Sequence, residues 1–164
     1  MANESEWTWG SETAFAVTDL ASLDDGQIWN SVQISQTTTG AQKVRIYYDL
    51  DWLGSDTPAA GDTLIFRLCD GGSDGTQRDG NVLATQAKTT DAADVSNFQA
   101  ACKRVHTHAF LTSNEDPITG SFDIDEPPMY WTLLIEVDTP SGSALAASGA
   151  SVGHQYGSPQ YQTS

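Results

Sequence analysis

The apolar residues of this 164-residue chain lie in short blocks, and polar turn residues end each block. In residues 43–52, for example, valine, isoleucine, tyrosine, leucine and tryptophan occupy every second position. Because successive side chains of a strand point to opposite faces, this period of two predicts strands with one buried and one solvated face. The expected strands cover residues 13–18, 28–35, 43–53, 63–69, 81–86, 103–111, 120–124, 129–137 and 151–161.

One segment has helical spacing instead. Val95 and Phe98 lie three residues apart and Asp91 can cap the segment, so we expect a short helix over residues 91–101. Residues 130–137 are almost continuously apolar, which predicts a central strand covered on both faces. Eight or nine short strands with one helical insertion predict an all-β fold, a two-sheet antiparallel β-sandwich of the jelly-roll type. The cysteine and tryptophan spacing does not fit the alternative, an immunoglobulin-like sandwich.

A chain of this length can bury enough surface to fold as one domain without metals or other staples. We expect an N-terminal arm over residues 1–12, the jelly-roll domain over 13–161 and a short tail over 162–164. Trp7 and Trp9 flank one threonine in the arm, so an extended backbone places both indoles on one face. They indicate either half of an edge strand or an arm that docks on a neighbouring subunit.

The charge balance restricts the partners. Lys and Arg total 7 against 22 Asp and Glu, which gives a formal net charge of −15. A protein needs clustered cations to bind nucleic acid or an anionic membrane, so neither is an expected partner. No apolar run reaches the length of a membrane span, and the N-terminus lacks the basic and apolar regions of a signal peptide. We therefore expect synthesis in the cytoplasm without secretion.

Few residues suggest metal chemistry. Asp70, Asp74 and Asp79 could offer oxygens to Ca²⁺, but their spacing departs from the EF-hand pattern, and such loops also form simple hairpin turns. They are weak calcium candidates, and we expect no metal and no cofactor. His106 and His108 share one strand face, where either Cys102 or His154 could add a third ligand. A simpler interpretation is that the His-Thr-His run lies on a solvated strand face and binds no metal.

The two cysteines are too few for a disulfide framework, and their spacing does not decide whether they pair. We expect Cys69 and Cys102 to be free thiols that are buried or half-buried. Asp123 and Asp125 could form the acid pair of a glycoside hydrolase, but no cleft motif accompanies them. Nucleophile-elbow, zinc-protease and nucleotide-binding motifs do not occur, so we expect no enzymatic activity.

Several short sequence motifs, none of them invariant, follow one another in a characteristic order. They are TDLASLDDG at 18–26, KVRIYYDLD at 43–51, TPAAGDTLIFRL at 57–68, an Asp-Gly-rich turn ending at 80, PPMYWTLLIEV at 127–137, GSALAASG at 142–149 and VGHQY at 152–156. Over about residues 13–161 this order resembles a group of small jelly-roll structural proteins of tailed bacteriophages, which decorate or cement the capsid. A long insertion at 87–103 departs from the pattern.

The resemblance implies a non-enzymatic virion protein on the outer surface of the capsid. Its implied partners are the major capsid protein and neighbouring copies of itself, for which a homotrimer is one arrangement. Aromatic groups would bury the joint between shell subunits. The candidate partner-binding residues are Trp7, Trp9, Trp29, Tyr156 and Tyr161. The alternative is a carbohydrate- or receptor-binding module of a phage tail or fibre, with an exposed aromatic platform and Ca²⁺ in the 70–79 loop.

Overall fold

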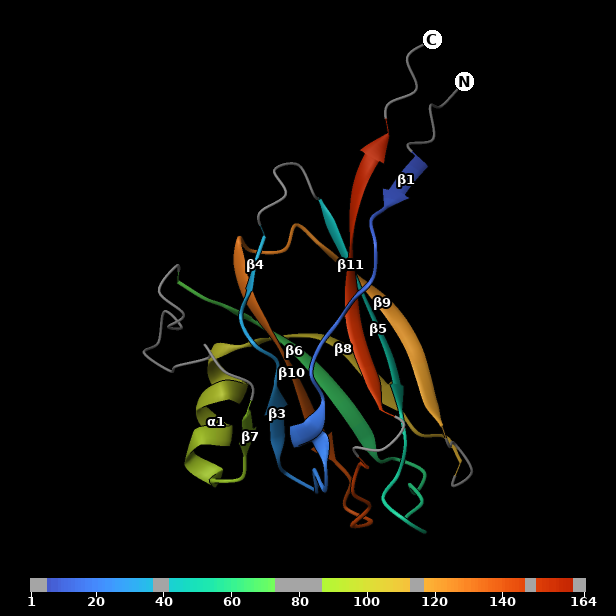
Figure 1. Cartoon of the computed structure of the whole chain (residues 1–164). Helices are drawn as coiled ribbons and strands as arrows, with labels where there is room; N and C mark the ends of the chain where they lie inside the picture. The colour runs from blue at the N-terminus through green and yellow to red at the C-terminus, as the bar shows by residue number, and fades with distance from the viewer. Residues whose placement is uncertain (1–5, 37–41, 73–86, 113–116, 147–149, 161–164) are drawn as a thin grey trace.

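The computed structural model describes residues 6–36, 42–72, 87–112, 117–146 and 150–160. Within them, two antiparallel sheets pack face to face as a sandwich (Figure 1). The all-β, two-sheet prediction is therefore confirmed. One sheet has the order β1 (Glu6–Trp9), β11 (Ser151–Gln160), β5 (Lys43–Leu50), β9 (Ile118–Asp125), with β2 (Thr13–Ala14) also paired to β11. The other has the order β7 (Ala87–Thr89), β3 (Ile28–Asn30), β10 (Tyr130–Asp138), β6 (Thr63–Asp70), β8 (Lys103–Ala109), with β4 (Ile34–Ser35) on β10.

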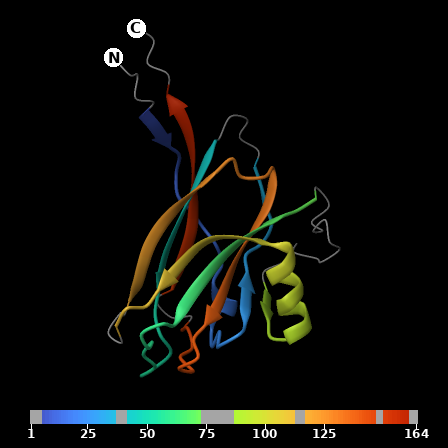
Figure 2. The ribbon, with the colours of Figure 1, turned by 180° about the vertical axis from the view of Figure 1, so that it is seen from behind.

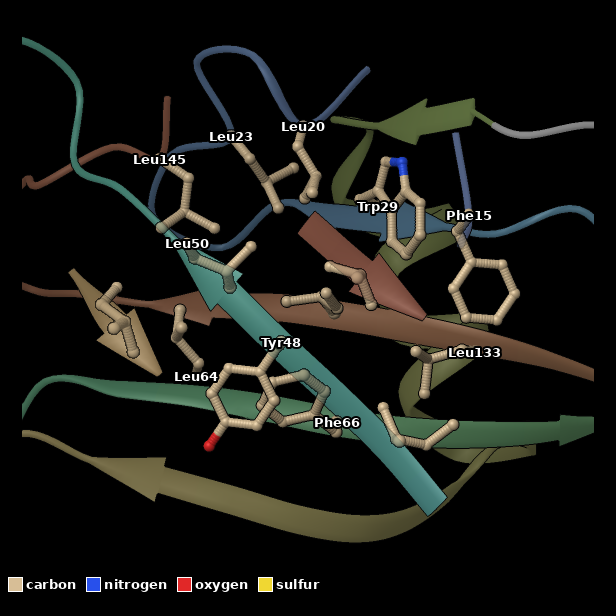
Figure 3. Packing of buried hydrophobic residues seen from close by; sticks show 14 of the residues in the cluster. Phe15, Leu20, Leu23, Trp29, Tyr48, Leu50, Leu64, Phe66, Leu133 and Leu145 are labelled. Carbon is tan, nitrogen blue, oxygen red and sulfur yellow. The ribbon is translucent and has the colours of Figure 1, made fainter. Parts of the chain in front are cut away.

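The alternating residues of β5 form one wall of the core. Val44, Ile46, Tyr48 and Leu50 are buried, whereas the residues between them are half-buried or exposed. They meet side chains of the facing sheet, among them Phe66, whose ring centroid lies 4.7 Å from that of Tyr48 (Figure 3). The period of two in the sequence therefore identified the buried face correctly.

Strand β10 lies in the middle of its sheet, and its residues 131–137 are all buried. Helix α1 (Ala92–Ala101) lies against this sheet beside β7 (Figure 2). Its Val95 and Phe98 form a buried cluster with Leu134 of β10, on the face of the sheet opposite the main core. The Asp91 side chain caps the helix by accepting hydrogen bonds from the amides of Ala93 and Asp94. The predicted central strand and helix are both confirmed.

A buried ion pair between two strands of this sheet also binds the helix, and sequence analysis did not anticipate it. Arg67 on β6 donates from Nε to Glu136 on β10 at 2.7 Å, and both side chains are less than one-tenth exposed. Gln99 of the helix donates to the other Glu136 oxygen at 2.7 Å. Both carboxylate oxygens are thus satisfied, which buried charges require.

Two of the expected strands are interrupted. The segment at 13–18 is a strand only over Thr13–Ala14, and a 3-10 turn (Thr18–Leu20) follows. The segment at 28–35 divides into β3 and β4, because the Ser31 hydroxyl, instead of a backbone carbonyl, accepts the hydrogen bond of the Leu133 amide at 3.1 Å. The weak strand expected at 81–86 lies outside the described residues.

The prediction of two free thiols is wrong. Cys69 on β6 and Cys102 at the end of the helix form a disulfide, with Cα atoms 4.5 Å apart. The residues are 33 positions apart, so the sequence alone did not show that the helix returns its C-terminus to β6. The bond fixes that end of the helix on the sheet.

We expect the Cys69→Ala/Cys102→Ala variant to be less stable by about 3–4 kcal/mol, because opening a loop of this length restores chain entropy to the unfolded state. Urea unfolding followed by tryptophan fluorescence measures the difference. The oxidised wild-type protein and the wild-type protein in reductant are the matched comparisons. An unchanged midpoint in the variant would contradict a stabilising role for the bond.

Candidate functional site

Strand β1 and the end of β11 form a two-stranded ribbon. The register runs from Glu6 opposite Gln160 to Trp9 opposite Gly157, whereas the pairing of β5 with β11 ends at Gly157. Among the described residues, positions 158–160 therefore pair with β1 alone. Figure 1 shows this terminal ribbon, residues 6–9 and 157–160, extending beyond the body of the sandwich at the top of the view.

Both tryptophans of the ribbon lie on the outer face of the five-stranded sheet. Trp7 and Trp9 are half-buried, and their ring centroids are 6.4 Å apart with an interplanar angle of 32°. The Trp9 ring lies over Gly157, where a β-carbon would approach it to 2.9 Å. A glycine at that position therefore allows the indole to lie against the backbone of β11.

Each indole is in contact with a cation from β5. The Lys43 ammonium lies 4.8 Å from the Trp7 ring centroid, and the Arg45 guanidinium lies 4.1 Å from that of Trp9. Such contacts contribute about 0.5–1 kcal/mol each at exposed sites. They hold both rings in defined positions outside the core.

The same two cations bind carboxylates on β9. Arg45 contacts Asp123 through two hydrogen bonds of 2.7 and 3.1 Å, and Lys43 lies 2.9 Å from Asp125. The hydrogen bond to Asp123 raises the pKa of Arg45. Two rows of contacts therefore run across the sheet from tryptophan to cation to carboxylate. We call this surface the tryptophan face; it comprises Trp7, Trp9, Lys43, Arg45, Asp123 and Asp125.

The structure corrects another candidate contact residue. Trp29 on β3 is fully buried, and its ring meets Phe15 edge-on with centroids 6.3 Å apart. It cannot reach a partner, because β7 pairs with β3 and the core covers its ring. Trp29 is a core residue.

Tyr156 is also directed inward. It is half-buried, packs at the edge of the core, and lies 5.3 Å from the ring of His154. Burial raises the pKa of its hydroxyl. Tyr156 lies where the ribbon joins the sandwich and is not part of the tryptophan face. Tyr161, the other tyrosine candidate, lies outside the described residues.

The possible metal ligands do not converge. His106 and His108 point inward, not to a solvated face as expected, and both lie near the Tyr48 hydroxyl, at 3.4 and 3.0 Å. Burial and the neighbouring His108 lower the pKa of His106. Cys102 is in the disulfide, and His154 lies on the opposite sheet. Within the described parts of the chain, no three such side chains could hold a metal ion.

The proposed calcium loop is only partly described. Asp70, at the end of β6, is exposed, whereas Asp74 and Asp79 lie outside the described residues. The two aspartates considered as a hydrolase pair, Asp123 and Asp125, are each ion-paired with a different cation.

His154 should make folding stability depend on pH. It is 4% exposed, and burial lowers its pKa below the ordinary 6.5. The unfolded chain therefore takes up a proton near pH 6.5 that the folded chain binds only at lower pH. The contribution of His154 to stability should be constant above about pH 6.5 and fall below it, by up to about 1.4 kcal/mol per pH unit. Urea unfolding between pH 5 and 8 measures this slope. His154→Phe should make the slope smaller, while His106, whose pKa is lowered too, still contributes to it. An unchanged slope would contradict the assignment.

Comparison with known proteins places the chain in no family: no family model matches it, and no curated protein matches it either. No helix in the described part of the chain is long and apolar enough to cross a membrane.

Proposed function

We propose that this chain is a non-enzymatic structural protein of a phage virion, which binds the outer surface of the major capsid protein and stabilises the shell. The observation that carries the proposal is the tryptophan face on the terminal ribbon. Trp7 and Trp9 lie outside the core, beside each other, on strands that extend past the sandwich. Tryptophan is the residue type most enriched at energetically important interface positions.

The strand pairing supports the jelly-roll type that the sequence analysis expects. The antiparallel pairs are nested along the chain: β1 and β2 pair with β11, β3 and β4 with β10, β5 with β9, and β6 with β8. A hairpin rolled into two sheets has this nested pairing.

The charge also suits an exterior position. A chain with a formal net charge of −15 is repelled by packaged nucleic acid. Its contact with the shell must therefore come from local apolar and aromatic groups, which the ribbon presents. Neighbouring copies of the chain are the second proposed partner, since decoration proteins lie side by side on a shell.

Binding to particles tests this function. Particles of the source phage that lack the chain are mixed with the purified protein and sedimented. We expect saturable binding at a fixed ratio to the shell protein. Absence of binding at micromolar protein would overturn the proposal.

The same tryptophan face favours a second candidate, a carbohydrate- or receptor-binding module of a tail or fibre. Adjacent indoles with carboxylates nearby can stack on sugar rings and accept hydrogen bonds from hydroxyls. In this structure each ring also contacts a cation, which leaves less ring surface for a sugar. Glycan binding without particle binding would favour this candidate.

A further inference from the structure

The basic residues of this acidic chain differ in whether their side chains bind another group. Of its seven, Arg78 lies outside the described residues. Lys43 and Arg45 bind aspartates, and Arg67 binds Glu136. Lys88 donates to the carbonyls of Ala21 and Ser22 at 3.3 Å. Among the lysines and arginines of the described part of the chain, only Lys103 and Arg104, at the start of β8, have side chains without an ion pair, hydrogen bond or ring contact.

These two cations line a groove at the open side of the sandwich. Two adjoining pockets of about 240 and 230 Å³ lie between β8 and β9, and Lys103 lines both. Apolar side chains of Leu68, Val105 and Ile124 contribute to its surface. The groove therefore combines an apolar surface with a basic rim.

The opposite rim is acidic but largely neutralised. Asp123 and Asp125 line the first pocket, and each is ion-paired with a cation of β5. The unpaired charge in that pocket is therefore positive. Asp70 and Glu126 line the second pocket and would repel a bound carboxylate. A carboxylate is therefore favoured only near Lys103 and Arg104.

The two strands that border the groove also have a free edge among the described residues, with backbone groups that no neighbouring strand pairs. β8 is the last strand in its sheet and β9 the last in the other, and each has one paired neighbour among the described residues. An extended peptide can pair with such an edge and place alternate side chains in the groove. A free small anion would use the cations but neither the edge nor the apolar surface.

We propose that this groove binds an extended segment of another protein in which carboxylates alternate with apolar side chains. The apolar side chains lie in the groove on Val105, Ile124 and Leu68, and the carboxylates, on the other face of the segment, reach Lys103 and Arg104 at its rim. The inference does not depend on the virion assignment, because neither Trp7 nor Trp9 lines the groove; the groove shares only Asp123 and Asp125 with the tryptophan face.

The test uses an acetylated, amidated VEVEV peptide as the probe and a VKVKV peptide as its charge-reversed counterpart. Amide resonances of the full chain are followed by NMR during titration at low salt. We expect VEVEV to shift resonances of residues 103–105 and 123–125, and VKVKV to leave them unchanged. Raising the salt should weaken the binding.

A pair of variants separates the groove from overall charge. Lys103→Gln/Arg104→Gln should weaken VEVEV binding at least about tenfold, because two charge-assisted contacts are lost. Ser55→Asp/Asn97→Asp lowers the net charge by the same two units at exposed positions outside the groove and its bordering strands, and should weaken binding much less. Circular dichroism verifies the fold of both. Absence of shifts at millimolar VEVEV, equal binding of VKVKV, or unchanged affinity in the glutamine variant would each overturn the proposal. Failure of particle binding alone would leave it standing.

Discussion

Replacing Trp7 and Trp9 together by alanine is expected to weaken binding to capsid particles at least about a hundredfold and to leave the sandwich folded. Interface tryptophans commonly cost about 2 kcal/mol or more each when truncated, and 1.4 kcal/mol corresponds to a factor of ten. Neither indole contributes to the core cluster. The expected loss therefore concerns association and hardly concerns folding.

Co-sedimentation with particles over a range of protein concentrations gives the affinity. Thr8→Ala is the matched control, since this exposed residue lies between the two tryptophans on the opposite face of β1. It should bind as the wild type does. Lys43 and Arg45 remain in the double variant with their aspartates, so the ion pairs on the sheet stay intact. Wild-type affinity in a folded Trp7→Ala/Trp9→Ala variant would contradict the role of the tryptophan face.

Replacing Trp29 by alanine should have the opposite result, a large loss of stability without a specific loss of binding. The side chain is fully buried against Phe15, and truncating a buried aromatic residue to alanine costs about 3–5 kcal/mol. This is a large fraction of the about 5–15 kcal/mol by which a domain is stable.

Urea unfolding measures the change in the free energy of unfolding. Trp9→Ala is the comparison, and we expect it to cost about 1 kcal/mol or less, because its ring is half-buried outside the core. A similar cost for the two tryptophans would contradict the distinction between a core and a surface indole. The fraction of Trp29→Ala that remains folded should bind particles normally.

The sequence predicted those parts of the fold that depend on local pattern. The alternation in residues 43–50 identified both faces of β5, and the continuous apolar run at 131–137 identified a central strand. In β3 the three residues Ile28, Trp29 and Asn30 are all buried. Pattern alone could not assign Trp29 there, because both faces of that strand are covered.

The remaining features depend on contacts between distant segments. Pairing of Cys69 with Cys102 requires that the helix end beside β6, and the buried Arg67 and Glu136 meet only because β6 and β10 are neighbours. No local property of these residues predicts either contact. The inward direction of His106 and His108 likewise follows from the register of β8 on β6, which places them opposite the core residues Phe66 and Leu64.

The candidate site was predicted in part. The Trp-Thr-Trp alternation correctly placed Trp7 and Trp9 on one face, and the edge-strand interpretation agrees with their pairing to β11. The contribution of Lys43 and Arg45 could not be predicted, because it depends on β11 lying between β1 and β5. The alternation of β5 did indicate that both cations point outward, and this was the one sequence feature that could have suggested their role.

The copy number of the chain in purified virions of its source tests the proposed capsid role most directly. Quantitative gel densitometry against the major shell protein measures it. We predict a copy number comparable to that of the shell protein, as a protein that covers the shell requires. A few copies per particle would contradict capsid decoration and favour a tail or fibre position, and complete absence would contradict any virion role.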